Sequence, residues 1–149
     1  LDHPSFEEGV QWTRRRVVAN ETLFAEGEPG TEVYLILKGS VRVVGTVDLD
    51  GQRTVHPGFS ELGEGQVFGE LPLFDGEPRS ATVVALTDGE LAVLEGERLM
   101  AFLDVHPDLG YPIFKELILL LVGRLRQANR RIFSLFAWGL KTRGIEQHL

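Results

Sequence analysis

Short apolar runs, separated by turns that contain glycine, dominate the chain from Val17 to about Glu95. Of the 17 glycines, 12 lie between Gly27 and Gly96, so that nearly every run is followed by a turn signal. Strands of this length and spacing are typical of a β-sandwich or a small β-barrel. The predicted strands are 22–24, 33–37, 41–44, 67–68, 81–86 and 91–94.

Three of these segments carry more specific information. The continuous apolar run at 33–37 predicts a strand that is buried on both faces or forms a barrel wall. Asp50-Gly51 is the strongest hairpin signal, because both residues tolerate the positive φ of a tight turn. The runs 81–86 and 91–94 are expected to form a last pair of strands around Asp88-Gly89.

From Glu97 the apolar spacing becomes helical. A short helix is predicted over 98–103, and a second one restarts after His106-Pro107-Asp108, since proline fits a first turn. The second helix is predicted to run towards Trp138 with an apolar position alternately every three and four residues. These positions are Tyr111, Phe114, Ile118, Leu121, Leu125, Ala128, Ile132 and Leu135. Such a heptad seam indicates helix–helix packing, and the alternative is a helix folded onto its own β domain.

The expected organisation is therefore a lead-in over 1–16, a β-barrel over 17–106, a long helix over 107–138 and a tail over 139–149. The lead-in is expected to be irregular or briefly helical. The basic run Arg14-Arg15-Arg16 is interpreted as a solvated face or a strand edge, with a partner-binding patch as the alternative.

Composition narrows the class of protein. A chain of 149 residues with 43% hydrophobic residues is long enough for one domain with a proper core. Its longest apolar run, 117–122, is too short to cross a membrane, and without a signal-peptide pattern a cytoplasmic location is expected. The absence of cysteine excludes disulfides and thiolate metal sites. A net charge of −7 disfavours direct nucleic-acid binding.

An enzyme is not expected. The four histidines are scattered along the chain and include no His-x-His pair, so that the ligand set of a metal-dependent β-barrel enzyme is missing. There is also no nucleophile with a base at motif spacing. We therefore predict no catalytic residue, no metal and no cofactor.

The stretch from Phe68 to Thr82 carries the chemistry of an anion site. Gly69 lets the backbone approach a ligand closely, and a short helix is predicted from Glu70 to Phe74, whose first N–H groups attract negative charge. Arg79 offers a planar fork of donors that suits a phosphate, and Ser80 adds a hydroxyl. A carboxylate would repel a phosphate, so that Glu70 is expected to face another group, such as sugar hydroxyls.

The order Phe68-Gly69-Glu70-Leu71, a spacer, and Pro78-Arg79-Ser80-Ala81-Thr82-Val83 resembles the phosphate-binding cassette of the cyclic nucleotide-binding domain family. This family includes catabolite activator proteins, kinase regulatory subunits and gated channels. The likeness covers roughly residues 20–125. It implies a mainly β fold with α, namely a jelly-roll β-barrel (double-stranded β-helix) followed by a long C-terminal helix that forms a parallel homodimer.

The resemblance also implies roles for individual residues. Glu70 would bind the ribose 2′-hydroxyl, Arg79 and Ser80 the cyclic phosphate, and the Gly69 backbone would lie beside the ribose. Asn129, with Ala128, matches the position that caps the base, where an amide both accepts and donates; alternatively it is simply an exposed helix residue. The full set of expected ligand-binding residues is Phe68, Gly69, Glu70, Leu71, Arg79, Ser80, Ala81 and Asn129.

Pro72 departs from the family pattern. The family commonly has alanine at this position, and its N–H helps to hold the phosphate, whereas proline has no N–H. Proline suits the first turn of a helix, so that the fold is expected to survive. The alternative is a cassette that persists only as a structural turn in a non-binding interaction module.

The resemblance implies a bacterial, non-enzymatic cyclic nucleotide sensor that regulates a partner protein as a homodimer. Ser80 favours cAMP over cGMP, because eukaryotic members that prefer cGMP usually have threonine there; cyclic di-GMP stays open. Alternatively, the chain is the sensory fragment of a catabolite activator-like transcription regulator. Residues 139–149 are too few for the helix-turn-helix DNA-binding domain of such a regulator, and neither direct nucleic-acid binding nor membrane association is expected.

Overall fold

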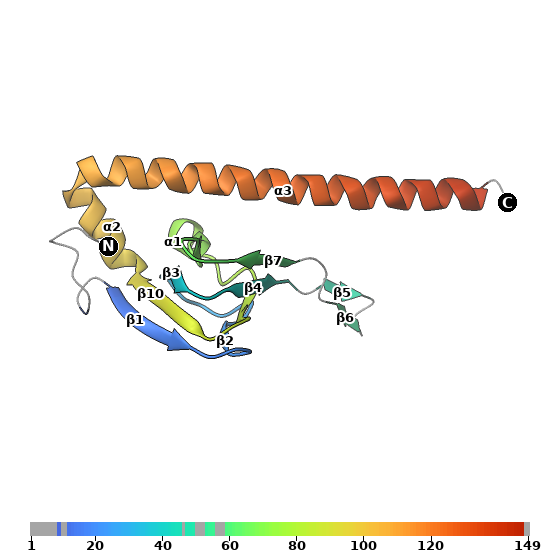
Figure 1. The fold of residues 1–149 in the computed structure, drawn as a ribbon. Helices are drawn as coiled ribbons and strands as arrows, with labels where there is room; N and C mark the ends of the chain where they lie inside the picture. The colour runs from blue at the N-terminus through green and yellow to red at the C-terminus, as the bar shows by residue number, and fades with distance from the viewer. Residues whose placement is uncertain (1–8, 10–11, 46, 50–52, 56–58, 148–149) are drawn as a thin grey trace. The chain divides into compact units, whose positions relative to one another are not determined.

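The computed structural model describes residues 9, 12–45, 47–49, 53–55 and 59–147 (Figure 1). The chain divides into two compact units, Leu1–Phe102 and Leu103–Leu149, which are described separately below. The first unit contains all the β-strands, and the second contains most of a long helix.

The described strands of the first unit are antiparallel. In chain order they are β1 (Trp12–Val17), β2 (Thr22–Phe24), β3 (Glu32–Lys38), β4 (Val41–Val44), β5 (Val47–Leu49), β6 (Arg53–Val55), β7 (Phe59–Leu62), β8 (Val67–Phe68), β9 (Thr82–Ala85) and β10 (Gly89–Glu95). One sheet has the order β1-β10-β3-β8 and another has the order β2-β9-β4-β7. The hairpin β5–β6 stands apart, and the turn predicted at Asp50-Gly51 lies outside the described residues.

The two four-stranded sheets share one apolar core. Its buried members come from both sheets and are Val17, Leu23, Phe24, Tyr34, Ile36, Val41, Leu62, Phe68, Val83, Ala85 and Leu91. This arrangement confirms the expected jelly roll, but no ladder of hydrogen bonds between described strands closes the sheets into a barrel. Strands β2 and β8, which lie at the edges of the two sheets, are only three and two residues long. Their pairing stops where the chain passes between the sheets.

Strand β3 is buried on both faces, as its continuous apolar run predicted. Tyr34 and Ile36 point into the core shared by the sheets, while the alternate residues join a second apolar cluster. That second cluster contains Trp12, Val33, Ala92 and Leu94, with Leu35, Leu37, Val67, Leu73, Leu99 and Phe102 packed against it. Leu99 and Phe102 belong to helix α2 (Gly96–Val105), which covers this face of the sheet.

Strands β9 and β10 do not pair with each other, contrary to the expectation of a last strand pair. β9 lies between β2 and β4, whereas β10 lies between β1 and β3 in the other sheet. The connection between them crosses from one sheet to the other, and its side chains bind backbone N–H groups in two other turns. Thr87 Oγ1 accepts from Ser40 N at 3.2 Å, and Asp88 Oδ1 accepts from Ala19 N at 2.8 Å.

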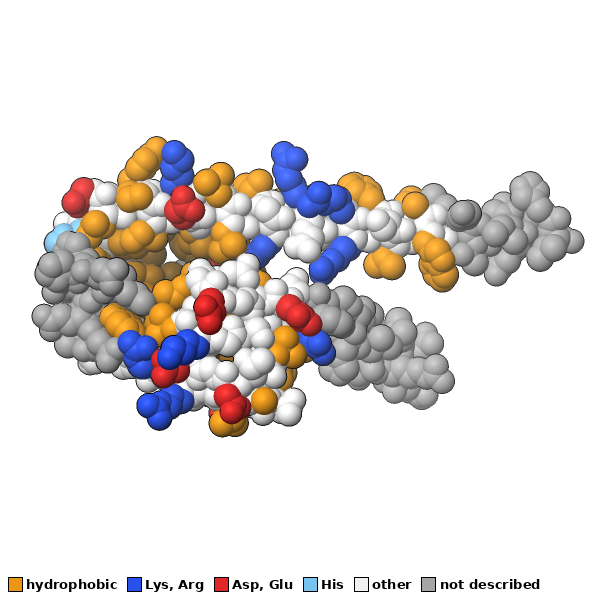
Figure 2. Space-filling view, viewed as in Figure 1, with side chains coloured by type: hydrophobic (Ala, Val, Ile, Leu, Met, Phe, Trp, Pro, Cys, Tyr) orange, Lys and Arg blue, Asp and Glu red, His pale blue; other side chains and the backbone are white. Residues whose placement is uncertain are grey.

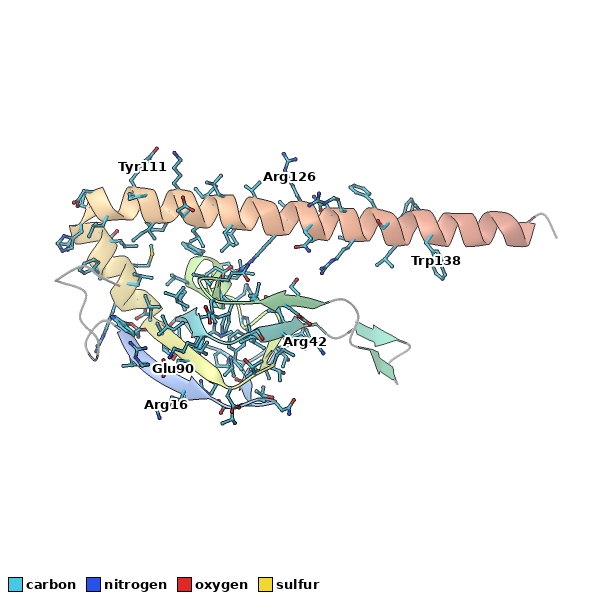
Figure 3. All side chains as sticks on the ribbon, viewed as in Figure 1. Arg16, Arg42, Glu90, Tyr111, Arg126 and Trp138 are labelled. Atoms are coloured by element: carbon cyan, nitrogen blue, oxygen red, sulfur yellow. The ribbon has the colours of Figure 1, made fainter. Side chains whose placement is uncertain are left out.

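The first strand begins at Trp12, inside the segment expected to be an irregular or briefly helical lead-in. This strand, β1, pairs with β10 and so adds one strand to the sheet. The pairing runs from Trp12↔Leu94 to Val17↔Gly89. The basic run is a strand edge, as one interpretation predicted, and Arg14 pairs with Glu90 at 3.1 Å while Arg16 lies 3.9 Å from the same carboxylate (Figure 3).

Helix α3 (Pro107–Gln147) makes up most of the second unit. Near its start Gly110 N donates to His106 O at 3.0 Å, and the helix accommodates Pro112. The helix continues past Trp138 into the expected tail, since no proline interrupts it there. Among the described residues, no helix is long and apolar enough to cross a membrane.

Many large apolar side chains of α3 are exposed, including those of Tyr111 near one end and Trp138 near the other (Figures 2 and 3). The seam residues Ile118, Leu125, Ile132 and Leu135 are 59%, 62%, 61% and 69% exposed. Helices in a stable monomer rarely leave such a stripe in water. The heptad pattern is therefore present as a continuous helix whose seam is exposed at these four positions and half-buried at Phe114 and Leu121.

Candidate ligand-binding site

The cassette predicted from the sequence forms a continuous structure between β8 and β9. Gly69 follows β8 with φ of +81°, a conformation that favours glycine. Glu70 is the N-cap of α1 (Leu71–Asp75), close to the predicted helix at Glu70 to Phe74. Gly76, at φ +69°, ends α1 and donates its N–H to Pro72 O at 3.0 Å. The chain then turns through Arg79 into β9.

The guanidinium of Arg79 is held in place by three hydrogen bonds. Nη1 donates to the Gly69 carbonyl at 2.7 Å, and Nη2 donates to the carbonyl of Glu32 at 3.0 Å and to its carboxylate oxygen Oε2 at 3.3 Å. The guanidinium carbon lies 4.3 Å from the centre of the Phe24 ring, which is cation–π distance. The Arg79 side chain is only 3% exposed, so that its orientation is strongly constrained.

Two glycines leave room for this guanidinium. A Cβ on Gly69 would lie 2.9 Å from Arg79 Nη1, and a Cβ on Gly30 would lie 2.9 Å from Nη2. Real Cβ atoms do not come so close to other heavy atoms, so that any side chain at either position would displace Arg79. The close approach at Gly30 thus depends on the position of the arginine, because no positive φ is recorded for this glycine.

Glu70 is buried to the same extent as Arg79, with 4% of each residue exposed. Among the described residues these two form the whole group of buried polar or charged residues. The Glu70 side chain makes no capping hydrogen bond to α1, although its carbonyl accepts from Leu73 N at 3.1 Å. Its burial is thus not explained by helix capping.

Aromatic rings lie beneath the cassette. Phe68 stacks on Tyr34 with the ring centres 5.0 Å apart and the planes 5° from parallel, and Phe24 lies against both. Burial raises the pKa of Tyr34, and the nearby Glu32 carboxylate raises it further. The rings therefore give Arg79 an apolar support on one face.

The turn between β2 and β3 is tied to the cassette. Arg79 N donates to Glu28 O at 2.8 Å, and Gly27 N donates to Arg79 O at 2.8 Å. Farther along, Glu26 N donates to Thr82 Oγ1 at 3.0 Å. The side chains of Glu26 and Glu28 are exposed beside these bonds.

Seven of the eight residues expected to bind ligand lie together at this end of the first unit. They are Phe68, Gly69, Glu70, Leu71, Arg79, Ser80 and Ala81. Phe68, Glu70 and Arg79 are buried, whereas Ser80 and Leu71 are exposed. The eighth residue, Asn129, is exposed on α3 in the second unit. The roles of all eight residues stay predictions.

Sequence reasoning missed three residues of this site, namely Glu32, Gly30 and Phe24. Each contacts Arg79 from a segment more than forty residues away in the chain. The local sequence around each of them predicts only a strand or a turn. Glu32 gives one weak signal, because it is an acidic residue directly before the apolar run 33–37. No group of three or more side chains suited to hold a metal occurs among the described residues.

Comparison with known proteins agrees with this geometry. Residues 14–106 match the family model described as a cyclic nucleotide-binding domain. A CRP-like cAMP-activated global transcriptional regulator of Mycobacterium tuberculosis is 30% identical over 114 residues, which are 76% of this chain and 47% of that protein. The cyclic AMP receptor protein of Thermus thermophilus is 35% identical over 116 residues, which are 78% of this chain and 50% of that protein. The chain thus spans about half the length of these curated relatives.

Solved structures give the same result for the fold. A cyclic nucleotide-binding domain from Methylobacillus flagellatus superposes with a TM-score of 0.72 at 31% identity, covering 83% of this chain and 67% of that one. The catabolite activator protein of Thermus thermophilus gives a TM-score of 0.65 at 34% identity, covering 84% and 55%. A c-di-GMP-responsive global regulator of Xanthomonas campestris gives 0.57 at 27% identity, covering 70% and 50%.

Proposed function

The chain belongs to the cyclic nucleotide-binding domain family and is related to bacterial cAMP-activated regulators, and on that premise we propose that it is a cAMP sensor. The sensor is non-enzymatic, acts as a homodimer through α3, and regulates a partner protein. Two parts of the protein support this proposal: the cassette supports ligand binding, and the exposed seam of α3 supports the homodimer.

The observation that carries the proposal is the paired burial of Glu70 and Arg79. Removing a carboxylate and a guanidinium from water is costly unless both have polar partners. Within the described residues, Arg79 uses at most three of its five N–H groups, in the bonds to Gly69 and Glu32. A cyclic phosphate at this position would offer acceptors for the other donors.

The proposed ligand roles are those that the resemblance to the family implies for the residues of the cassette. Arg79, the exposed hydroxyl of Ser80 and the backbone at Ala81 bind the cyclic phosphate, and Glu70 accepts from the ribose 2′-hydroxyl. Phe68, Gly69 and Leu71 lie beside the sugar. The assignment of Asn129 to the base rests on the resemblance to the family alone. The choice of cAMP over cGMP rests on Ser80 and on the names of the relatives in Mycobacterium and Thermus.

The proposed dimer rests on the seam of α3. Apolar residues recur alternately every three and four positions, with isoleucine at 118 and 132 and leucine at 121 and 135. Isoleucine and leucine at alternate seam positions of this kind favour a two-stranded parallel coiled coil. A second copy of α3 would cover the stripe that Ile118, Leu125 and Ile132 leave exposed.

Calorimetric titration of the ligand-stripped protein with cAMP, cGMP and cyclic di-GMP tests the proposal. Glu70→Gln keeps the volume of the side chain and removes its charge, so that cAMP affinity is expected to fall about tenfold or more, the loss of one hydrogen bond to a charged group. Glu64→Gln, at an exposed position in the turn before β8, is the matched control and should bind as the wild type does.

Two outcomes would contradict the proposal. Equal cAMP affinity of the wild type and Glu70→Gln would remove the assigned role of Glu70. No binding of any of the three nucleotides would favour an interaction module on an inherited fold, which would still dimerise through α3.

A further inference from the structure

Two segments of the chain that contact or contain Arg79, residues 26–32 and 75–79, carry five carboxylates. They are Glu26, Glu28, Glu32, Asp75 and Glu77, and are named the acidic rim below. Glu28 is placed directly beside Arg79, because its carbonyl accepts from Arg79 N at 2.8 Å. Glu32 Oε2 lies 3.3 Å from Nη2 of the same arginine.

The other three members are placed by neighbouring backbone bonds. Glu26 N donates to Thr82 Oγ1 at 3.0 Å, which sets it across from the start of β9. Glu77 lies two residues before Arg79, and its N–H donates to Asp75 Oδ1 at 2.9 Å. Glu26, Glu28, Asp75 and Glu77 are exposed, so that their charges face solvent around the cassette rather than its interior.

The balance of charge around this anion site is unusual. Residues 26–32 and 69–82, all of them described, contain six acidic residues, counting Glu70, and a single basic one, Arg79. A site that gathers anions by charge normally collects several cations. Within these two segments one buried arginine supplies the attraction, and the exposed carboxylates oppose every further negative charge on a ligand.

We propose that the acidic rim selects ligands by charge, accepting the singly charged cyclic phosphodiester and rejecting nucleotides with two or more negative charges. This inference rests on the proposed function. Opening the cyclic phosphate by hydrolysis adds a second ionisable oxygen, so that the product, a 5′-monophosphate, is close to doubly charged at neutral pH. The rim thus lets the sensor release the hydrolysed form of its own signal, and it disfavours cyclic dinucleotides for the same reason.

The expected size of the effect follows from screened Coulomb interactions. Glu28→Lys with Glu77→Lys changes the rim by four charges at exposed positions, and each charge is taken to act on the ligand over about 9 Å. For each negative charge on the ligand, affinity should rise about threefold at 0.15 M salt and about eightfold at 0.02 M. Affinity for 5′-AMP should therefore rise by the square of the factor found for cAMP, and affinity for adenosine should not change.

The experiment is competition of cAMP and 5′-AMP against a fluorescent cAMP analogue, at pH 7.5 and at two salt concentrations. Wild type is compared with Glu28→Lys/Glu77→Lys and with Glu61→Lys/Glu64→Lys, which makes the same charge change outside the two turns. The ratio of the dissociation constants of 5′-AMP and cAMP is the readout. Because it compares two ligands on one variant, it cancels effects of the substitutions on folding.

The ratio is expected to fall about threefold in the rim variant at 0.15 M salt, to fall further at 0.02 M, and to stay constant in the control. An unchanged ratio in the rim variant, or an equal change in the control, would overturn the inference while leaving the cAMP sensor intact. Failure of the wild type and both variants to bind cAMP would overturn the proposed function, and the inference with it.

Discussion

At the scale of single residues, the surroundings of Arg79 explain how a charged side chain is kept in the interior. Its positive charge is met by two carbonyl oxygens and the Glu32 carboxylate, and its face is covered by Phe24. A buried charge is tolerated when its hydrogen bonds are made in good geometry, but removing one partner is then expensive. Changes that move Arg79 away from these partners are thus expected to lower the stability of the fold as well as the affinity for a ligand.

Gly30→Ala is a test of this positioning. The added Cβ would meet Arg79 Nη2 at 2.9 Å and Nε at 3.1 Å, and the guanidinium would have to shift. We expect cAMP affinity to fall about tenfold, as for the loss of one charged hydrogen bond, measured by calorimetry. Gly63→Ala is the control, since a Cβ there meets nothing within 4 Å. Equal affinities of the two variants would show that Arg79 need not stay where it lies.

Tyr34 gives the protein a pH dependence at high pH. Burial raises the pKa of Tyr34 above its usual 10.0, and the Glu32 charge adds to this effect. In the unfolded chain the phenol ionises near pH 10, before the folded one does. The stabilisation by neutral Tyr34 is therefore complete below pH 10 and is lost as pH rises through the folded pKa.

The measurement is the free energy of unfolding in urea between pH 8 and pH 11. We expect it to fall above about pH 10, near the tyrosine reference value, and to fall less steeply in Tyr34→Phe. Tyr111→Phe replaces a tyrosine that is 73% exposed and should keep the wild-type slope. The same slope in Tyr34→Phe and wild type would assign the loss of stability to other groups.

At the scale of elements, the five residues of α1 combine a structural role with a proposed role in binding. Pro72 lies in its first turn, where a missing N–H costs little, and the residue is buried. Leu73 of the same helix packs against the second apolar cluster. The helix is thus anchored on one side while Glu70 and Gly69, directly before it, belong to the proposed site.

Pro72→Ala is expected to increase cAMP affinity. It restores an N–H in the first turn of α1, and one new hydrogen bond to the phosphate would be worth between about twofold and tenfold in affinity. Pro78→Ala changes an exposed proline of the same cassette and should leave affinity unchanged. Calorimetry with cAMP measures both, and an unaltered affinity in Pro72→Ala would mean that the ligand makes no use of this position.

At the scale of the whole molecule, the exposed seam of α3 predicts self-association. Leu125→Glu places a carboxylate at the centre of the seam, where two copies would face each other, and should convert the proposed dimer to a monomer. Sedimentation velocity across a range of concentrations measures the change. Gln127→Glu introduces the same charge at an exposed position off the seam and is expected to leave the dimer intact. A monomeric wild type would remove the proposed role of α3.

Much of the fold could be predicted because its signals are local. The strand 41–44 coincides with β4, and the alternation of apolar residues in 33–37 describes both faces of β3. The change to a helical period marks α2 and α3 within a few residues. The predicted end of the long helix differs from the observed one. Helix α3 runs beyond Trp138 because no residue in the local sequence forces it to stop.

The errors concern which segments meet. The runs on either side of Asp88-Gly89 look like a hairpin, but side chains of that turn bind Ser40 and Ala19, and the two strands enter different sheets. Closure of a barrel likewise depends on the lengths of β2 and β8, which pairing between distant segments decides. The periodicity of apolar residues predicts which face of a strand is buried. It does not predict which other strand lies beside it in the sheet.

By itself the sequence determined the class of fold, the long helix with its seam, and the cassette from Phe68 to Ala81, because each is written in contiguous residues. Only the tertiary structure decided that Gly30, Glu32 and Phe24 complete the surroundings of Arg79. Those contacts join segments far apart in the chain, and their existence depends on how the sheets pack. A buried charge needs partners from several directions, and no local pattern encodes where they come from.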